Sequence, residues 1–339
     1  MDCYAKRISY QGLDCAELAA GGYYALISAQ TGSSVLRLRD TVRGIEVFRF
    51  SESYTAEDIK AFPEVFGLPT LYLPNRFADG RLKTSDAEYL LPINEPLFHN
   101  HIHGFMHKRA HSVDLVRADG ETAVVKTSFV YDESDEMFAV FPVEFKAEFT
   151  FTLSAQGLEY SLTMTNLSDV QMPVSIATHT AIKAPFLDGA EKSDMRLHIP
   201  VGERCEINER WLPTEKLLPL SSDDNEYNSG AKLPITRVIC NEMFTAVQGK
   251  TEDMPLYGFT VTDKASGCKI INEVSPEYKF WIVWNNDGNG DFFCPEPMTA
   301  MIDAPNLGLP AEVSGYNELS PNESYTVWQK FYTRSGDGK

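Results

Sequence analysis

Apolar and polar residues alternate with a period of two along much of this chain. In residues 145–152 every second side chain is apolar, and residues 158–164 repeat the pattern after a Gln156-Gly157 turn. Successive side chains of a strand point to opposite faces, so the two segments predict a β-hairpin with one buried face. Similar patterns predict strands at residues 4–10, 22–28, 34–38, 44–50, 112–117, 122–131, 171–178, 236–240, 256–262, 269–274, 278–284 and 325–332.

Helical periodicity is confined to one short segment. Residues 55–62 predict a helix that is stopped by Pro63, while the polar stretches 188–194 and 221–232 predict surface loops. Many antiparallel strands, without helices to cover a parallel sheet, indicate stacked antiparallel sheets. The sequence therefore predicts an all-β fold, a large antiparallel β-sandwich with few short helices, and a single domain over residues 1–339.

The composition narrows the class of partner. The chain has 339 residues and a net charge of −18, which disfavours nucleic acid and membrane surfaces and suits a neutral small molecule. Six cysteines are scattered without a C-x-x-C pair, which argues against a zinc ribbon or a disulfide-stapled secreted domain. With no apolar run of transmembrane length and no leader-like start, we expect a cytoplasmic protein, either a monomer or a homodimer.

Five of the seven histidines fall between residues 99 and 111. If the start of this stretch is extended, His99, His101 and His103 share one face. Three imidazoles on a strand face suit zinc, copper or iron, and they also suit a polar pocket wall that hydrogen-bonds hydroxyl groups. No spacing identifies a further ligand from elsewhere in the chain, so we predict no metal site.

A single carboxylate, Glu296, lies between Pro295 and Pro297. Each proline fixes its own φ and pushes the preceding residue away from helix, so Glu296 is expected on rigid, extended backbone. The aromatic run 280–284 and a turn at 285–291 precede it. A carboxylate held rigidly beside buried aromatic residues suits general acid–base chemistry, and the alternative is a solvated Glu in a Pro-rich connection.

Two further residues stand out by their surroundings. His179 ends an apolar strand after small residues, and its imidazole titrates near neutral pH. Arg76 follows Pro74-Asn75 between an aromatic and an apolar segment, where its guanidinium fork suits two neighbouring oxygens of a ligand. The alternative is a surface Arg that pairs with Asp79.

Five segments, in this order, resemble the aldose 1-epimerase (galactose mutarotase) family. They are N-R-F-A-D-G-R-L from Asn75, N-H-I-H-G-F from Asn100, A-T-H-T from Ala177, C-P-E-P-M-T-A-M-I-D-A-P-N from Cys294 and L-S-P-N-E-S-Y from Leu319. The resemblance implies a β-supersandwich with one sugar pocket that acts on free aldoses without a cofactor. It also implies that Glu296 is the general base, that His179 is the general acid, and that Asn75, Arg76 and His103 bind the sugar.

The chain departs from the family pattern at several places, of which two bear on the choice of sugar. Phe105 stands where the family usually carries a second Gly, and the triplet from His103 is similar to a hexose-6-phosphate mutarotase-related branch. Where the family usually carries an Asp that binds sugar hydroxyls, this chain has Asn241 and Glu242, and either could take that role. The reaction type is thus predicted, while the sugar and its phosphorylation state stay open.

The resemblance predicts an isomerase that opens and recloses a cyclic hexose. A proton leaves the anomeric hydroxyl and another reaches the ring oxygen, and we expect the carboxylate and the imidazolium on opposite sides of the sugar. Two alternatives remain from the sequence. One is a non-catalytic carbohydrate-binding sandwich, and the other is a metal-dependent enzyme that uses His99, His101 and His103.

Overall fold

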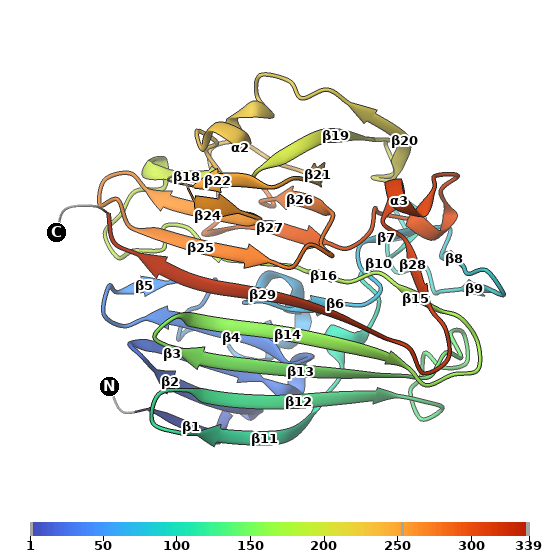
Figure 1. Cartoon of the computed structure of the whole chain (residues 1–339), viewed down its shortest axis with the longest axis horizontal. Helices are drawn as coiled ribbons and strands as arrows, with labels where there is room; N and C mark the ends of the chain where they lie inside the picture. The colour runs from blue at the N-terminus through green and yellow to red at the C-terminus, as the bar shows by residue number, and fades with distance from the viewer. Residues whose placement is uncertain (1–2, 252–253, 337–339) are drawn as a thin grey trace.

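The computed structural model describes residues 3–251 and 254–336. One long sheet forms the front layer in Figure 1, and two further sheets lie behind it. The long sheet runs in the order β11 (Ser112–Ala118), β12 (Ala123–Tyr131), β13 (Phe145–Ser154), β14 (Gly157–Asn166), β29 (Ser324–Arg334), β25 (Lys269–Val274), β24 (Gly258–Asp263) and β18 (Met195–His198).

The second layer consists of two sheets that cover different parts of the first. One runs in the order β1 (Tyr4–Tyr10), β2 (Leu13–Ala20), β3 (Tyr23–Ser28), β4 (Ser34–Asp40) and β5 (Ile45–Glu46). The other, called the site sheet below, runs in the order β20 (Pro213–Leu218), β19 (Val201–Ile207), β21 (Glu242–Ala246), β26 (Phe280–Trp284), β27 (Phe292–Met298), β16 (Ala177–Thr178) and β6 (Thr70–Leu71), and β17 (Ile182–Lys183) also pairs with β27.

Short elements connect these layers. Four two-stranded sheets pair β7 (Arg76–Ala78) with β10 (Asn100–Ile102), β8 (Arg81–Lys83) with β9 (Glu88–Leu90), β15 (Met172–Val174) with β28 (Asn317–Leu319), and β22 (Gly249–Thr251) with β23 (Met254–Leu256). The helices are α1 (Ala56–Ala61), α2 (Asn225–Ser229) and α3 (Ala311–Ser314), with 3₁₀ turns η1 (Ala29–Thr31), η2 (Pro63–Val65), η3 (Met106–Lys108), η4 (Lys192–Asp194) and η5 (Ala304–Asn306). Within the described ranges, each helix is too short to cross a membrane.

The hydrophobic core lies between the two layers. The alternating apolar residues of β13, which include Phe149 and Phe151, are buried together with residues of β2 and β3. At the other end of the long sheet, Phe259 of β24 meets Trp281 of β26 with ring centroids 5.9 Å apart. Every ladder between the named strands is antiparallel. The prediction of a large all-β antiparallel sandwich is therefore confirmed.

Strand β26 is buried on both faces, which explains its uninterrupted apolar sequence. Trp281 and Val283 belong to the core between the layers, whereas Ile282 belongs to a second apolar cluster on the far face of the site sheet. Because Ile282 pairs directly with Glu296 on β27, the register sets Glu296 on the same face as Ile282. This face of the site sheet carries the candidate site.

Two local predictions were wrong. Residues 236–240 form no strand, because the Asn285 side chain takes over their hydrogen bonds: it accepts from Ile239 N and donates to Arg237 O. Residues 221–232 are not a simple surface loop, since they contain α2 and the fully buried Tyr227. The predicted helix at 55–62 is confirmed as α1, which has a capping box between Thr55 and Asp58.

Candidate active site

A cavity of about 240 Å³ opens on the face of the site sheet that carries Glu296. This volume lies just below the usual range for small-molecule pockets, which begins at about 300 Å³. Its walls combine two carboxyl groups, two imidazoles, one guanidinium and two amides with an aromatic ring and aliphatic side chains. The lining residues are Glu64, Val65, Asn75, Arg76, Ile102, His103, His179, Asn241, Trp284 and Glu296.

Glu296 and His179 meet because Glu296 lies on β27 and His179 directly follows β16, the neighbouring strand of the site sheet. Strands β16 and β27 are antiparallel with Ala177 opposite Met298, and the same register places His179 opposite Glu296. The His179 Nε2 atom lies 3.4 Å from Glu296 Oε1. Both side chains are almost completely buried. The sheet ladder thus fixes the distance between an imidazole and a carboxyl group.

The prolines on either side of Glu296 occupy a gap in the ladder. On the edge of β27 that faces β16 and β17, the paired positions are Met298, Phe293 and Phe292. Pro295 and Pro297, which have no N–H to donate, lie between these positions. The sequence prediction that Glu296 sits on extended backbone agrees with β27.

Burial keeps both members of the pair neutral. Desolvation raises the pKa of Glu296 well above its usual range, and the charge of Arg76 offsets this shift only in part. Desolvation also lowers the pKa of His179 to about 4, against the charge of Glu64, which raises it. At neutral pH the pair therefore holds one proton that can be exchanged, and it can both accept a proton and donate one.

Arg76 is held by a carboxylate from the chain itself. Its Nε lies 2.8 Å from Glu95 Oε2 and its Nη2 lies 2.8 Å from Glu95 Oε1, which is a bidentate pair. Its Nη1 donates to Asn75 Oδ1 at 3.3 Å. Arg76 is buried and lines the cavity, so the alternative of a surface Arg that pairs with Asp79 is wrong.

Three residues that line the cavity have left-handed backbones. Asn75, His103 and Asn241 have φ values of 55°, 66° and 50°. Non-glycine residues in this region cost free energy and concentrate at functional sites. Gly104, which follows His103, has a φ of 60°. A Cβ atom there would lie 2.3 Å from the carbonyl oxygen of Tyr72, so only glycine fits at this position. These left-handed backbone conformations are strained, and they occur at residues that line the cavity.

Comparison with known proteins identifies the family to which the chain belongs. The sequence profile described as aldose 1-epimerase matches residues 14–332. The chain belongs to the aldose 1-epimerase family. A galactose mutarotase-like protein from Clostridium acetobutylicum is 32% identical, with a TM-score of 0.95 over 98% of this chain and 99% of that chain.

More distant structures share the fold with this family member. A galactose 1-epimerase from Lactobacillus acidophilus is 16% identical, with a TM-score of 0.73 over 98% of this chain and 99% of the other. An aldose epimerase homologue from C. elegans is 15% identical, with a TM-score of 0.70 over 98% of this chain and 100% of that one. At these identities the likeness extends to the fold alone.

The histidine-rich stretch does not converge on one point. His99 and His103 have positive φ values, so the stretch is not evenly extended and the expected shared face does not form. His99 Nδ1 lies 2.9 Å from Asp79 Oδ1 on the surface, and His101 Nδ1 lies 2.8 Å from Pro92 O in the interior. Only His103 of the three lines the cavity. The alternative of a metal-dependent enzyme built on these three histidines is therefore wrong.

Another group has the composition of a metal site. Among the residues described, His179, Cys294 and Glu296 have potential ligand atoms within 4.8 Å of one another. Imidazole, thiolate and carboxylate ligands fit zinc. This group contains the paired imidazole and carboxyl, and burial raises the pKa of the Cys294 thiol well above its usual range. A metal here would need to displace protons from the pair.

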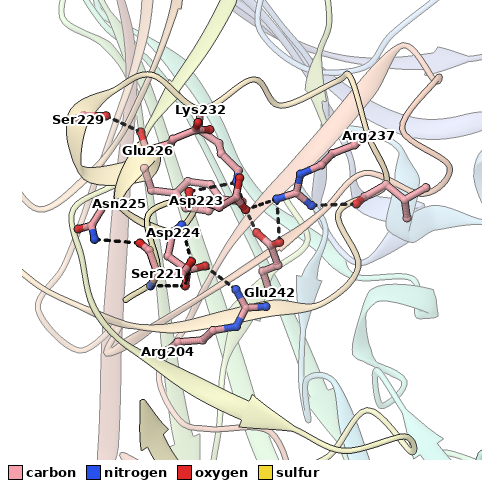
Figure 2. A network of polar contacts seen from close by, with 12 residues as sticks. Arg204, Ser221, Asp223, Asp224, Asn225, Glu226, Ser229, Lys232, Arg237 and Glu242 are labelled. Carbon is pink, nitrogen blue, oxygen red and sulfur yellow. Dashed lines mark hydrogen bonds and ion pairs between the residues drawn. The ribbon is translucent and has the colours of Figure 1, made fainter. Parts of the chain in front are cut away.

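Glu242 does not line the cavity, although the sequence placed it beside Asn241 as a sugar ligand. Its carboxylate accepts a hydrogen bond from Tyr227 at 2.7 Å. It also pairs with Arg237, at 3.2 Å; Figure 2 shows this second contact. Neighbouring residues point to opposite sides of a strand, and the register of β21 with β26 places Asn241 beside Trp284 at the cavity. Of the two candidates, Asn241 lies at the site.

Sequence reasoning missed Glu64, which lines the cavity from η2. Its Oε1 accepts a hydrogen bond from His107 Nε2 at 2.8 Å and lies 2.9 Å from Lys108 Nζ. Trp284 lines the cavity and meets the His179 ring edge-on at 5.5 Å, whereas Trp281 is in the core.

Proposed function

We propose that this aldose 1-epimerase family member interconverts the α and β anomers of a free aldose by acid–base ring opening and reclosure. The observation that carries the proposal is the 3.4 Å contact between His179 Nε2 and Glu296 Oε1 inside a cavity of monosaccharide size. A hemiacetal opens when the anomeric hydroxyl loses a proton and the ring oxygen gains one. A pair that shares one exchangeable proton supplies both transfers without a cofactor.

The proposed cycle conserves protons. With the exchangeable proton on His179, Glu296 takes the proton of the anomeric hydroxyl while His179 protonates the ring oxygen, and the C1–O5 bond breaks. The aldehyde then rotates about C1–C2, and O5 attacks its other face. Glu296 returns its proton to the oxygen on C1, and His179 recovers the proton of O5. The products are the opposite anomer and the original pair.

Glu296 and His179 lie side by side rather than on opposite sides of a sugar. The anomeric oxygen and the ring oxygen are bonded to the same carbon, so an acid and a base that approach them from one direction must themselves be close together. A separation of 3.4 Å suits that requirement. In this proposal the sugar presents its C1–O5 edge to the pair.

The other lining residues are assigned to charge stabilisation and to binding. Arg76, held by Glu95, stabilises the negative charge on Glu296 during the proton transfer, since it is the charge that offsets the raised pKa of that carboxyl. The Nδ1 atom of His103 is buried without a protein hydrogen-bond partner within the described ranges, which leaves it for a sugar hydroxyl. Asn75 and Asn241 add amide groups to the cavity wall.

The test is Glu296→Gln, which keeps the shape of the side chain and removes its basicity. Polarimetry of freshly dissolved α-D-glucose and α-D-galactose should show equilibration slowed by about 10²–10⁴-fold relative to wild type. Calorimetric binding of the sugar should persist in the variant. If the wild-type protein equilibrates no aldose faster than buffer does, the catalytic proposal fails and a carbohydrate-binding role replaces it.

A further inference from the structure

Glu64 brings a second carboxyl group into the cavity, and the reaction cycle above gives it no task. Its side chain is 16% exposed. The imidazole of His107 and the ammonium group of Lys108 both contact the same carboxylate oxygen, Oε1. Across residues 3–251 and 254–336, no hydrogen bond is formed by Oε2. Oε2 is not one of the buried side-chain atoms that lack a partner, so it is accessible, and Glu64 lines the cavity; this oxygen is therefore available to accept hydrogen bonds from a ligand.

Glu64 and Glu296 have opposite protonation behaviour in the same cavity. Burial by itself would raise the pKa of Glu64, but the hydrogen bonds from His107 and Lys108 outweigh it and hold the pKa well below its usual range. Burial raises the pKa of Glu296, and the charge of Arg76 offsets this shift only in part. At neutral pH, therefore, Glu64 is a charged acceptor and Glu296 is the titrating member of the pair.

The cations around the cavity already have carboxylate partners. Arg76 forks onto Glu95, and Lys108 contacts Glu64 itself. Burial lowers the pKa of His103 well below its usual range and that of His179 to about 4, so both imidazoles are neutral. Among the residues that the structure describes at the cavity wall, none offers an uncompensated positive charge to an anionic group of a ligand. The net charge of −18 adds to this disadvantage.

We infer that Glu64 binds a hydroxyl group of an uncharged aldose and selects against sugars that carry a phosphate or a carboxylate. The inference rests on the proposed function and specifies its substrate class. A carboxylate accepts strong, charge-assisted hydrogen bonds from hydroxyl groups, and it repels a second anion in a cavity without a spare cation. Glu64 supplies the ionised acceptor that Asn241, a neutral amide, does not.

The deciding experiment compares wild type with Glu64→Gln on α-D-glucose and α-D-glucose 6-phosphate. The glutamine keeps an oxygen for the His107 donor and loses the charge. We expect KM for glucose to rise about 10-fold to 100-fold, because a hydrogen bond to a charged group is lost, while kcat changes little. The kcat/KM preference for glucose over its 6-phosphate should fall at least about tenfold.

The matched control is Glu57→Gln, which removes the same charge from the exposed face of α1. It should leave both KM values and their ratio unchanged. A purely structural role for Glu64 predicts instead that Glu64→Gln lowers kcat/KM equally for both sugars, and that result overturns the inference. A wild-type protein that prefers glucose 6-phosphate overturns it as well.

A binding measurement separates this inference from the proposed function. Calorimetry with glucose and with glucose 6-phosphate, on wild type and on Glu64→Gln, requires no turnover. If the protein binds glucose more tightly than the phosphate and Glu64→Gln removes that preference, the inference stands even where no anomer is equilibrated. If the protein is active but Glu64→Gln leaves the binding preference intact, the inference fails alone.

Discussion

Two buried polar clusters lie within the site sheet and its connections, and they differ in whether their polar groups have partners in the protein. In the cluster around Glu242, which we call the α2 network, each buried charge has a partner: Lys232 bonds Asp223 at 2.8 Å, and Arg204 pairs with Asp224 (Figure 2). In the cavity, Nδ1 of His179 and of His103 is buried without any hydrogen-bond partner from the described chain. The charges of the α2 network are paired within the protein, whereas the cavity retains polar atoms without a protein partner.

This difference indicates that the α2 network contributes mainly to stability and the cavity mainly to function. A buried polar group without a partner costs about 1–3 kcal/mol, which a fold tolerates where a ligand completes the bonding. The left-handed backbones of Asn75, His103 and Asn241 add to that cost at the cavity. We therefore expect substitutions in the cavity to remove activity at little cost in stability, and substitutions in the α2 network to do the reverse.

The largest effect is expected for His179→Gln. Removal of the imidazole takes away the proton donor of the pair, so the rate of anomer equilibration should fall by about 10²–10⁴-fold. The unfolding free energy should stay the same or rise, because the imidazole leaves an unpaired buried nitrogen in the ligand-free protein. Polarimetry and urea unfolding measure the two quantities. A variant that loses stability and keeps its rate would break the comparison.

The pH profile tests the shared proton directly. As pH falls through about 4, the imidazole of His179 takes up a proton while the carboxyl of Glu296 is already protonated. The pair then holds two exchangeable protons, and neither group can accept a proton from the sugar. As pH rises through the raised pKa of Glu296, the pair loses its only proton. The rate should therefore have a plateau that begins near pH 4 and ends on the alkaline side of an ordinary glutamate, with about a tenfold change per pH unit beyond each limit. A rate that does not vary from pH 3 to pH 10, measured by anomer-resolved NMR, contradicts the assignment.

An intermediate effect is expected for Glu242→Ala in the α2 network. The buried Tyr227 hydroxyl loses its acceptor, so the unfolding free energy should fall by about 1–3 kcal/mol. Glu242→Gln retains an acceptor oxygen and should lose less than Glu242→Ala in the same urea titration. In both variants the rate at saturating sugar should stay near that of wild type. A stable but inactive Glu242→Gln would assign Glu242 to the site.

The smallest effect is expected at Asn241, where glycine and alanine form a matched pair. Both remove the amide from the cavity, so KM for the sugar should rise a few-fold in each. Glycine tolerates the φ of 50°, whereas alanine pays about 1–2 kcal/mol for a left-handed backbone. Asn241→Ala should therefore be less stable than Asn241→Gly. Equal stabilities would mean that the backbone relaxes and that the site is not strained there.

The sequence predicted what depends on local periodicity and on motifs. The alternation in β13 and β14 gave the sandwich, and short motifs led to Glu296, His179 and Arg76, which the structure brings together in one cavity. Glu64 could not be found this way, because Pro63-Glu64-Val65 has no distinctive pattern. It enters the cavity through the tertiary packing of η2 against His107 and Lys108 of η3.

The wrong predictions about site residues share one physical origin. The face on which a side chain lies depends on the φ of its own residue and on the register of its strand, and neither is visible in residue type. His99 and His103 leave the extended conformation, which disperses the predicted imidazole face. Glu242 starts β21 and turns away from the cavity that Asn241 faces. A single backbone conformation or a shift by one position reassigns such residues.

The register that joins β16 to β27 has a consequence for the folding of the protein. His179 and Glu296 come from distant parts of the chain and meet only after these two strands have paired. Contacts between residues so far apart in sequence carry a large loop-closure cost and form slowly. If the proposed activity is present, its recovery after dilution from denaturant therefore reports the pairing of β16 with β27 in the site sheet, and this recovery should be slower than the return of the β13–β14 hairpin.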